Sequence, residues 1–449
     1  MTRAGILLII DYNLSRVADV ARMVAYARER HEVRTLLVRA NPGAHDLSIC
    51  DEVIDLDPTR ADFVDLALTQ LAPRRDALRG GIVFSDNAVH SGALLLERLG
   101  LRVDNAMLAL GAFSKHAYRL AERHHHALLD AQHVFAPDCV SITSVAELKT
   151  FADAHPDGFV VKPSCEGNNR GVIVVRAGDD LRAVFDEVAP YLAGGVICEQ
   201  MIPYRREYSY DGIGTLSFVT EKVSATGRYP VEVAQVLPAR LTSVEQHTLE
   251  RAGQLCNMLV GQRDGPFHNE IKLSDEGMHA AVVEPNRRPG GMKIWSLAEA
   301  VYGIDLYALW VDSVLGASSA SILPAPKRQA ATVMLGVPHD GIFSPASLGD
   351  GILLFEQVLT ATSAQHNLRP GQLHPGEFGW LSHDARIVHA VAHDNADFVA
   401  QATIILDTVD AEGHGDTRNA DIRDIVATLR DRWLTMLSAH HVPVLEIAA

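Results

Sequence analysis

The chain has 449 residues, of which 47 % are hydrophobic and 21 % are charged. This balance is typical of a folded globular protein, and the length predicts roughly three domains. A net charge of −16 disfavours non-specific binding to nucleic acid or to an anionic membrane. The five cysteines are scattered without paired spacing, and no apolar run is long enough for a signal peptide or a membrane span. We therefore expect a protein of the reducing cytoplasm.

The first unit, residues 1–112, alternates short apolar strands with amphipathic helices. Expected strands cover residues 5–10, 34–40, 51–57 and 81–86, and expected helices cover 15–30, 61–72 and 87–101. This alternation predicts an α/β unit with a Rossmann-like parallel sheet that is covered on both faces. Ligands of such sheets bind beyond the carboxyl ends of the strands. The polar residues at those ends are Asp11, Asn13, Asp86 and Asn87. They suit turns and helix caps equally well, so both roles stay open.

The second unit, residues 113–197, contains a predicted helix followed by a strand, an eight-residue loop and another strand. The loop, residues 164–171, is rich in small and polar side chains, so its backbone N–H groups could cover a polyphosphate. A lysine at the end of the preceding strand would add a positive charge, although an ordinary exposed hairpin lysine is the alternative. The residues of interest in this unit are Lys115, Lys162, Gly167 and Gly171.

The third unit, residues 198–320, begins with a strand that opens into a linker near Pro203. A passage of this kind can offer backbone groups to an adenine edge, and a carboxylate shortly afterwards can bind ribose hydroxyls. Glu199 and Glu207 fit that pattern. We expect helices over residues 242–259 and 296–316 in this unit.

Two strands of the third unit, FHNEIKL and VVEPNRRPGG, each carry a carboxylate, Glu270 and Glu284. Mg²⁺ prefers a few carboxylate oxygens together with water and substrate phosphates. Arg288 adds a fixed cation that could hold a phosphoryl group or an acyl oxygen. His268 shares a strand face with Glu270 and could assist catalysis or simply pack beside it. The cluster indicates ATP-dependent chemistry.

The last unit, residues 325–449, follows a proline-rich linker at 322–329. Short strands, turn signals and a final helix over 421–440 predict an α+β subdomain. The sequence shows no chemical motif there.

The order of these pieces resembles the ATP-grasp superfamily over about residues 100–320. The pieces are a lysine at a helix start, a strand-end lysine before a glycine loop, a strand–linker–Glu, an HxE strand and ExNxRxGG. The long segment after Gly291 looks like the C-terminal region of L-amino-acid ligases of the bacilysin-pathway type. The resemblance implies a two-lobed ATP-grasp domain, with a small lobe at 113–197 and a metal-binding lobe at 198–320.

The resemblance also implies a role for each motif residue. Lys115 and Lys162 would contact the phosphates of ATP, and the loop with Gly167 and Gly171 would close over them as a lid. Backbone groups of Glu199, Gln200 and Ile202 would bind adenine, and Glu207 the ribose. The metal ligands for Mg²⁺, or for Mn²⁺ in its place, would be Glu270, Glu284 and Asn286. The substrate residues would be Arg288, Gly290, Gly291 and His268, with Arg288 and Lys162 as catalytic groups.

The expected function is ATP-dependent carboxylate–amine ligation. The enzyme would join two amino acids, or amino-acid-like substrates, through an acyl phosphate and release ADP and phosphate. The alternatives are a biotin-carboxylase-like or purine-pathway ATP-grasp enzyme, or a non-catalytic nucleotide-binding regulator. We expect small-molecule partners, no nucleic acid, no membrane, and a homodimer.

Overall fold

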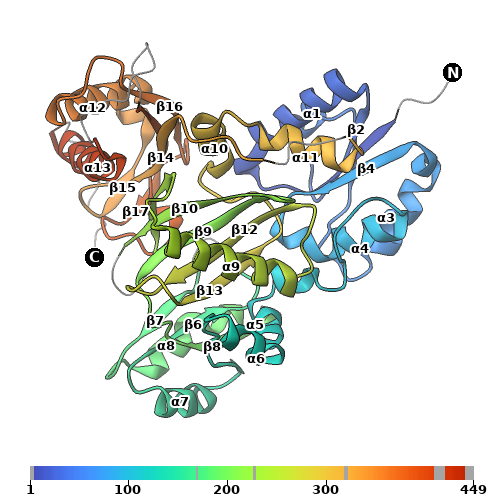
Figure 1. Cartoon of the computed structure of the whole chain (residues 1–449), viewed down its shortest axis with the longest axis horizontal. Helices are drawn as coiled ribbons and strands as arrows, with labels where there is room; N and C mark the ends of the chain where they lie inside the picture. The colour runs from blue at the N-terminus through green and yellow to red at the C-terminus, as the bar shows by residue number, and fades with distance from the viewer. Residues whose placement is uncertain (1–4, 168–169, 226–228, 318–321, 409–419, 440–449) are drawn as a thin grey trace.

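The computed structural model describes residues 5–167, 170–225, 229–317, 322–408 and 420–439. The described strands form four sheets, of four, eight, two and four strands. The N-terminal sheet lies at the right of Figure 1, the large sheet occupies the centre, and the small sheet lies below it. The C-terminal helices lie at the upper left, beyond the far strands of the large sheet.

The N-terminal sheet is parallel, with strand order β3–β2–β1–β4. All five residues of its central strand, β1, are buried. Alternate side chains of that strand enter two separate hydrophobic clusters, Leu7 and Ile9 in one and Leu8 and Ile10 in the other. The predicted parallel sheet with two covered faces is therefore confirmed. Its elements are β1 (Ile6–Ile10), α1 (Val17–His31), β2 (Arg34–Arg39), α2 (Ala44–Ile49), β3 (Glu52–Asp55), α3 (Phe63–Leu71), β4 (Leu78–Val83) and α4 (Val89–Leu99).

The small sheet is antiparallel, with strand order β5–β8–β6–β7. Helices α7 and α8 cover it, because their apolar side chains share one hydrophobic cluster with the strands. The helix expected at the start of this unit is two helices, since the backbone leaves helical geometry at His125. The elements are α5 (Lys115–His124), α6 (His126–Ala131), β5 (Cys139–Ile142), α7 (Val145–Ala154), β6 (Phe159–Pro163), β7 (Ile173–Val175), α8 (Leu181–Val188) and β8 (Val196–Gln200).

The large sheet has eight strands in the order β13–β12–β9–β10–β11–β14–β18–β16, all in antiparallel pairs. Strand β11 pairs with β14, so strands from the C-terminal part of the chain continue the sheet begun by β9–β13. The elements are β9 (Arg206–Ile213), β10 (Leu216–Ser224), β11 (Glu232–Leu237), α9 (Ser243–Leu259), β12 (Pro266–Leu273), β13 (Ala280–Asn286), β14 (Arg328–Leu335), β16 (Leu373–Trp380) and β18 (Ala400–Asp407).

The two faces of strands β9, β10, β12 and β13 differ in polarity, as the period of two in a strand allows. One face is apolar and packs beneath α9, and its side chains include Tyr208, Tyr210, Val219, Phe267 and Ile271. The opposite face carries charged and polar side chains. The candidate site lies on this polar face.

The helix expected over 296–316 is wrong as a single element. Two helices, α10 (Ile294–Tyr302) and α11 (Leu306–Val314), meet at a bend of 105°. Gly303 ends the first helix in the left-handed region, with φ 72°, and the Asp305 side chain caps the second. Both are standard helix-end signals. Among the described residues, no single helix is long and apolar enough to span a membrane, and this bent pair meets that test only jointly.

The C-terminal part combines two helices, a two-stranded sheet and the last strands of the large sheet. Helices α12 (Gly351–Gln365) and α13 (Ile422–Ala439) pack on the sheet around the buried Trp433. The two-stranded sheet pairs β15 (Gly341–Phe343) with β17 (Arg386–Val388) in antiparallel orientation. The expected α+β character is confirmed. Residue 440 of the expected final helix lies outside the described residues.

Candidate active site

The polar face of the large sheet brings three rows of side chains into register. Across the ladders, Lys222 lies opposite Glu207, which lies opposite Lys272. In the next row Ser209, Glu270 and Glu284 follow one another on adjacent strands. The third row contains Asp211, His268 and Asn286. The two carboxylates expected to bind metal, Glu270 and Glu284, are therefore direct cross-strand neighbours.

Each of these two carboxylates already has a lysine partner. The Nζ atom of Lys222 lies 2.7 Å from Glu270 Oε1, and the Nζ atom of Lys115 lies 2.7 Å from Glu284 Oε2. Burial disfavours the charge of Glu270, but Lys222 and His268 outweigh it and hold its pKa well below the usual range. Burial likewise opposes the charge of Lys115, yet the nearby glutamates raise its pKa. The charged forms of Glu270 and Lys115 are therefore both favoured.

The oxygen-only donor set of this row fits a hard divalent cation. The side chains of Glu270 and Glu284 are 23 % and 22 % exposed, so both remain accessible. Asn286 stands in the next row, where its amide nitrogen donates to the carbonyl of His268 at 3.2 Å. Two adjacent carboxylates with accessible oxygens suit Mg²⁺ or Mn²⁺.

His268 is held between two acidic groups on the same face. Its Nδ1 lies 2.6 Å from Asp211 Oδ1, and its Nε2 lies 3.4 Å from Glu270 Oε1. The hydroxyls of Ser209 and Thr220 donate to the other oxygen of Asp211, at 2.6 and 2.8 Å. Burial lowers the pKa of His268, but Asp211 outweighs it and the pKa rises to about 9. In the free protein His268 is therefore a cation at neutral pH.

A second ionic network links the small sheet to helix α5. Lys162 Nζ lies 2.6 Å from Glu199 Oε2, and Arg119 Nε lies 2.9 Å from Glu199 Oε1. Burial disfavours the charge of Glu199, but the two cations outweigh it and lower its pKa to about 2. Burial also lowers the pKa of Lys162, with Arg119 and Lys115 acting in the same direction.

Arg119 joins this network to the large sheet. Its guanidinium also contacts Glu122 at 2.5 Å and donates to the carbonyls of Val282 and Val283, each at 3.0 Å. The small sheet is thereby tied to β13 just before Glu284.

Two further residues expected at the nucleotide, Gln200 and Glu207, have definite partners. The backbone N–H of Gln200 donates to the Asp138 carbonyl at 2.8 Å. Glu207 pairs with Lys272 at 3.0 Å and accepts a hydrogen bond from the Ser224 hydroxyl. Ile202 follows the end of β8 and is half-buried.

The loop 164–171 starts beside α5. Lys115 Nζ donates to the carbonyl of Glu166 at 2.8 Å, and its backbone N–H donates to that of Ser164 at 2.9 Å. Gly171 has a φ of +67°, whereas a Cβ on Gly167 would meet nothing within 4 Å. Residues 168 and 169 of this loop lie outside the described residues.

Arg288 makes a two-bond ion pair with Asp86 from the N-terminal unit. Its Nε and Nη2 atoms donate to the two carboxylate oxygens, each at 2.8 Å. Burial disfavours the guanidinium charge, but Asp86 outweighs it and raises the pKa. Arg16, also from the N-terminal unit, donates to the carbonyls of Pro289 and Gly290. Asp86 therefore contacts the predicted site through Arg288.

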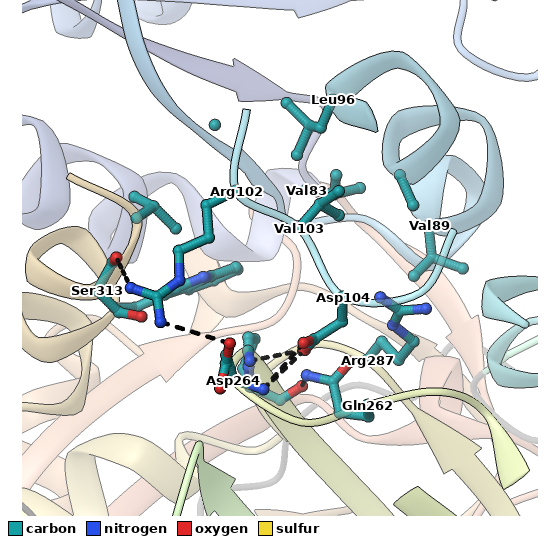
Figure 2. Close-up of a pocket in the computed structure, with 16 residues that line it drawn as sticks. Val83, Val89, Leu96, Arg102, Val103, Asp104, Gln262, Asp264, Arg287 and Ser313 are labelled. Carbon is teal, nitrogen blue, oxygen red and sulfur yellow. Dashed lines mark hydrogen bonds and ion pairs between the residues drawn. The ribbon is translucent and has the colours of Figure 1, made fainter. Parts of the chain in front are cut away.

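The arginine beside it, Arg287, points elsewhere. It lines a cavity between the N-terminal unit and the large sheet, together with Asp104, Gln262 and apolar side chains such as Leu96 (Figure 2). Its Nη1 donates to the carbonyls of Asn105 and Val260, at 2.7 and 3.3 Å. The cavity measures about 60 Å³, below the ~300–1,000 Å³ typical of ligand pockets.

Some site residues escaped the sequence reasoning, chiefly Arg119, Lys222 and Asp211. Arg119 had a usable signal, because it lies four residues after Lys115 on one helix and therefore on the same face. Lys222 and Asp211 had none, since their place depends on how β9, β10 and β12 align.

The chain has detectable relatives in sequence and in structure, although no family model matches it. Over 105 residues it is 38 % identical to Carnosine synthase 1 of Gallus gallus. That match covers 23 % of this chain and 11 % of the length of the relative.

Solved structures match nearly the whole chain. One is the phosphoribosylglycinamide synthetase of Anaerococcus prevotii, with a TM-score of 0.62, 14 % identity, and coverage of 96 % of this chain and 98 % of the other. Another is the carboxyaminoimidazole ribonucleotide synthase of Aspergillus clavatus complexed with ATP, with a TM-score of 0.64, 11 % identity, and coverage of 98 % and 100 %. The chain thus has the ATP-grasp fold.

A third structure agrees with the more specific resemblance. The L-amino acid ligase of Bacillus licheniformis superposes with a TM-score of 0.71 at 16 % identity, and the match covers 96 % of this chain and 98 % of that one.

Proposed function

We propose that the protein is an ATP-dependent carboxylate–amine ligase that joins two amino acids, or amino-acid-like substrates, in an amide bond. The names of the structural neighbours and of the sequence relative support C–N ligation, and the ATP complex of one neighbour supports the use of ATP. The observation that carries the proposal is the row of Glu270 and Glu284 with a lysine on each carboxylate and Arg288 just beyond.

The activation step needs groups that neutralise charge on a phosphate chain. A substrate carboxylate oxygen attacks the γ-phosphorus, the bond to the bridging oxygen breaks, and ADP leaves. Lys115 and Lys162 would bind the phosphate oxygens. To do so, Lys115 would release Glu284 and Lys162 would release Glu199. Glu270 and Glu284 would hold Mg²⁺, with Asn286 beside them, and the bound ion would neutralise negative charge on the phosphates.

The second step forms the amide from the acyl phosphate. The amine attacks the acyl carbon, phosphate leaves, and the nitrogen loses a proton. Arg288 would stabilise the oxyanion with the guanidinium hydrogens that Asp86 does not use, beside Gly290 and Gly291. An α-amino group has a pKa of about 7.7–8, so a neutral amine is available at slightly alkaline pH. His268, which is a cation in the free protein, would add positive charge beside Glu270.

Adenine and ribose would lie at the hinge between the two sheets. The adenine edge would be bound by backbone groups of Glu199, Gln200 and Ile202. Glu207 would bind the ribose after it releases Lys272. The loop with Gly167 and Gly171 would close over the phosphates and exclude water, because acyl phosphates hydrolyse.

The decisive experiment measures ADP and phosphate release with Mg²⁺ and ATP across a panel of amino-acid pairs. Turnover that needs two amino acids, with the dipeptide detected by mass spectrometry, would support the proposal. Turnover that depends on bicarbonate would favour a carboxylase. Absence of turnover together with ATP binding would favour a nucleotide-binding regulator.

Glu284→Gln should abolish product formation while the fold stays intact, because the amide keeps the size of the side chain but not the charge that holds Mg²⁺. Coupled ADP release measures the activity, and circular dichroism measures the fold. Glu276→Gln is the matched control, since Glu276 is exposed in the turn of the same β12–β13 hairpin. Retained activity in Glu284→Gln contradicts the metal assignment.

Several finer features stay predictions. They are the unit boundaries at residues 112, 197 and 320, the homodimer, and the cytoplasmic location.

A further inference from the structure

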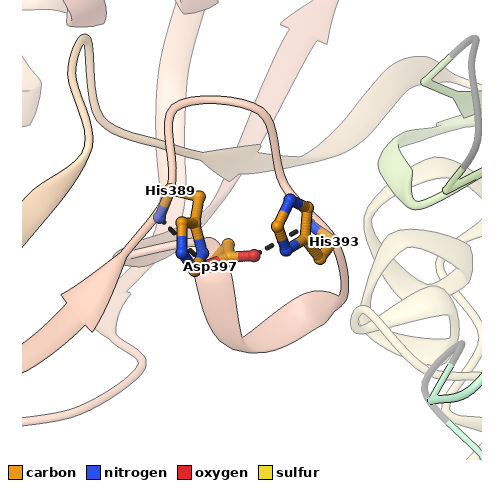
Figure 3. Close-up of side chains that lie close together, drawn as sticks. All are labelled: His389, His393 and Asp397. Carbon is orange, nitrogen blue, oxygen red and sulfur yellow. Dashed lines mark hydrogen bonds and ion pairs between the residues drawn. The ribbon is translucent and has the colours of Figure 1, made fainter. Parts of the chain in front are cut away.

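Two histidines and an aspartate converge in the loop between β17 and β18 (Figure 3). His389 directly follows β17, and Asp397 ends a short 3-10 turn, Asn395–Asp397, just before β18. One potential ligand atom from each of His389, His393 and Asp397 lies within 4.8 Å of the other two. A single nine-residue segment of this loop, residues 389–397, therefore supplies all three groups.

The carboxylate of Asp397 fixes this arrangement. Its side chain is 8 % exposed, and it accepts the backbone N–H of His389 at 2.9 Å and that of His393 at 2.8 Å. The Nδ1 atom of His389 lies 2.7 Å from the same carboxylate. Both histidines are thus anchored through their backbones to the third group. Backbone bonds that orient a carboxylate in this way also support a metal ligand.

The imidazole rings are partly exposed, and the ring of His393 also packs against that of Tyr229, with the centroids 4.7 Å apart. The two rings stack with their centroids 4.5 Å apart and an interplanar angle of 21°. The side chain of His389 is 37 % exposed, and His393 is exposed.

The ends of the loop are held independently of the histidine rings. Arg386 donates to the carbonyl of Phe398 at 2.5 Å, and the N–H of Ala390 donates to Asp340 at 2.8 Å. The rings can therefore adjust without unfolding the loop.

We propose that His389, His393 and Asp397 bind a divalent transition-metal ion of the Zn²⁺, Co²⁺ or Ni²⁺ class, and that the ion clamps this loop. Imidazole nitrogens suit such ions, whereas Mg²⁺ prefers oxygen donors. Three protein ligands leave one position for water or for a ligand atom. The site is distinct in chemistry from the row of Glu270 and Glu284, which offers oxygens alone. The proposal does not depend on the proposed ligase function.

The test titrates chelator-treated full-length protein with Co²⁺ in excess Mg²⁺ and follows visible absorption and calorimetry. Glu284→Gln serves as the background, so that the carboxylate row contributes little. The test variant carries His389→Gln and His393→Gln in addition. His383→Gln in the same background is the matched control, because His383 is an exposed histidine of the same segment.

One equivalent of Co²⁺ should bind to the background protein and to the His383→Gln control. The double histidine variant should lose more than ~100-fold in affinity, beyond the ~10–100-fold that supporting residues account for. Hydrogen exchange should slow over residues 389–397 when Zn²⁺ is added to the background protein and stay unchanged in the double variant. Unaltered affinity in the double variant, or no binding to the background protein, would overturn the proposal and leave Asp397 as a loop anchor alone.

Discussion

Asp86 fixes the orientation of the Arg288 side chain. Its two bonds to Arg288 fix the plane of the guanidinium, and the pair is only 18 % and 26 % exposed. Two parallel bonds hold a planar guanidinium in a single orientation. Asp86 is therefore a positioning residue for Arg288.

Asp86→Asn should reduce kcat by up to ~10²-fold, the effect of a small misplacement of a reacting group, while KM for ATP changes little. Steady-state kinetics with the best amino-acid pair separates the two constants. Asp62→Asn is the control, since Asp62 pairs with Arg60 on the surface of the same N-terminal unit. If Asp86→Asn lowered thermal stability together with kcat, and stabilising conditions restored kcat, the role of Asp86 would be purely structural.

Glu199 carries a stability that depends on pH. Its folded pKa of about 2 lies below the usual 4.5 because Arg119 and Lys162 favour the charged form. Its contribution is therefore fully present above about pH 4.5 and is lost as the pH falls towards 2. Glu199→Gln should cost ~3–5 kcal/mol at neutral pH, since it leaves buried cations unpaired.

Urea denaturation of the wild type and the variant at several pH values measures this contribution. The gap between the two proteins should close as the pH falls below 4.5. Lys149→Ala, which breaks the exposed Lys149–Asp153 pair, should have a much smaller effect at every pH. A gap that stays constant down to pH 2 is incompatible with the ionised Glu199.

At the scale of elements, the connection from β13 to α10 depends on two glycines in different surroundings. A Cβ on Gly290 would lie 2.4 Å from Ile294 Cδ1 and 2.8 Å from His268 Nδ1, whereas a Cβ on Gly291 would meet nothing within 4 Å. Gly290→Ala should therefore lose ~1–3 kcal/mol of stability through overpacking, and Gly291→Ala much less. Thermal unfolding of the two variants compares them directly, and an equal loss in both would show that close packing at Gly290 is unimportant.

The sequence predicted elements well where hydrophobic period and chain order sufficed. Strand β1 and helix α1 followed from an apolar run and an amphipathic stretch, and the two strand motifs predicted that Glu270 and Glu284 lie together, as they do. The bend between α10 and α11 had a visible signal in Gly303 and Asp305, but the continuous apolar content of the segment outweighed it. Strand register could not be predicted from the sequence, because it depends on pairing between distant segments. The partners of Lys222 and Arg288 were for that reason hidden.

At the scale of the whole molecule, the large sheet makes the C-terminal part a continuation of the central one. Ala234 and Val236 of β11 enter the hydrophobic cluster that Trp433 and the C-terminal strands build. A chain that ends at Gly316 should therefore expose the edge of β11 and aggregate. Soluble yield and size-exclusion chromatography measure this outcome. A soluble, cooperatively unfolding truncated chain would contradict the expected dependence.

The lysine partners of Glu270 and Glu284 have a further consequence for anyone who prepares or inhibits the protein. Because the free site holds its own counter-ions, chelation of metal leaves no bare carboxylates, and the metal-free protein should be stable on storage. Under the proposed function, entry of metal and nucleotide would be an exchange of ions, in which the carboxylates would pass to the metal and the lysines to the phosphates. A competitive inhibitor of the proposed enzyme would then have to replace both kinds of partner, which would favour zwitterionic compounds over simple phosphate mimics.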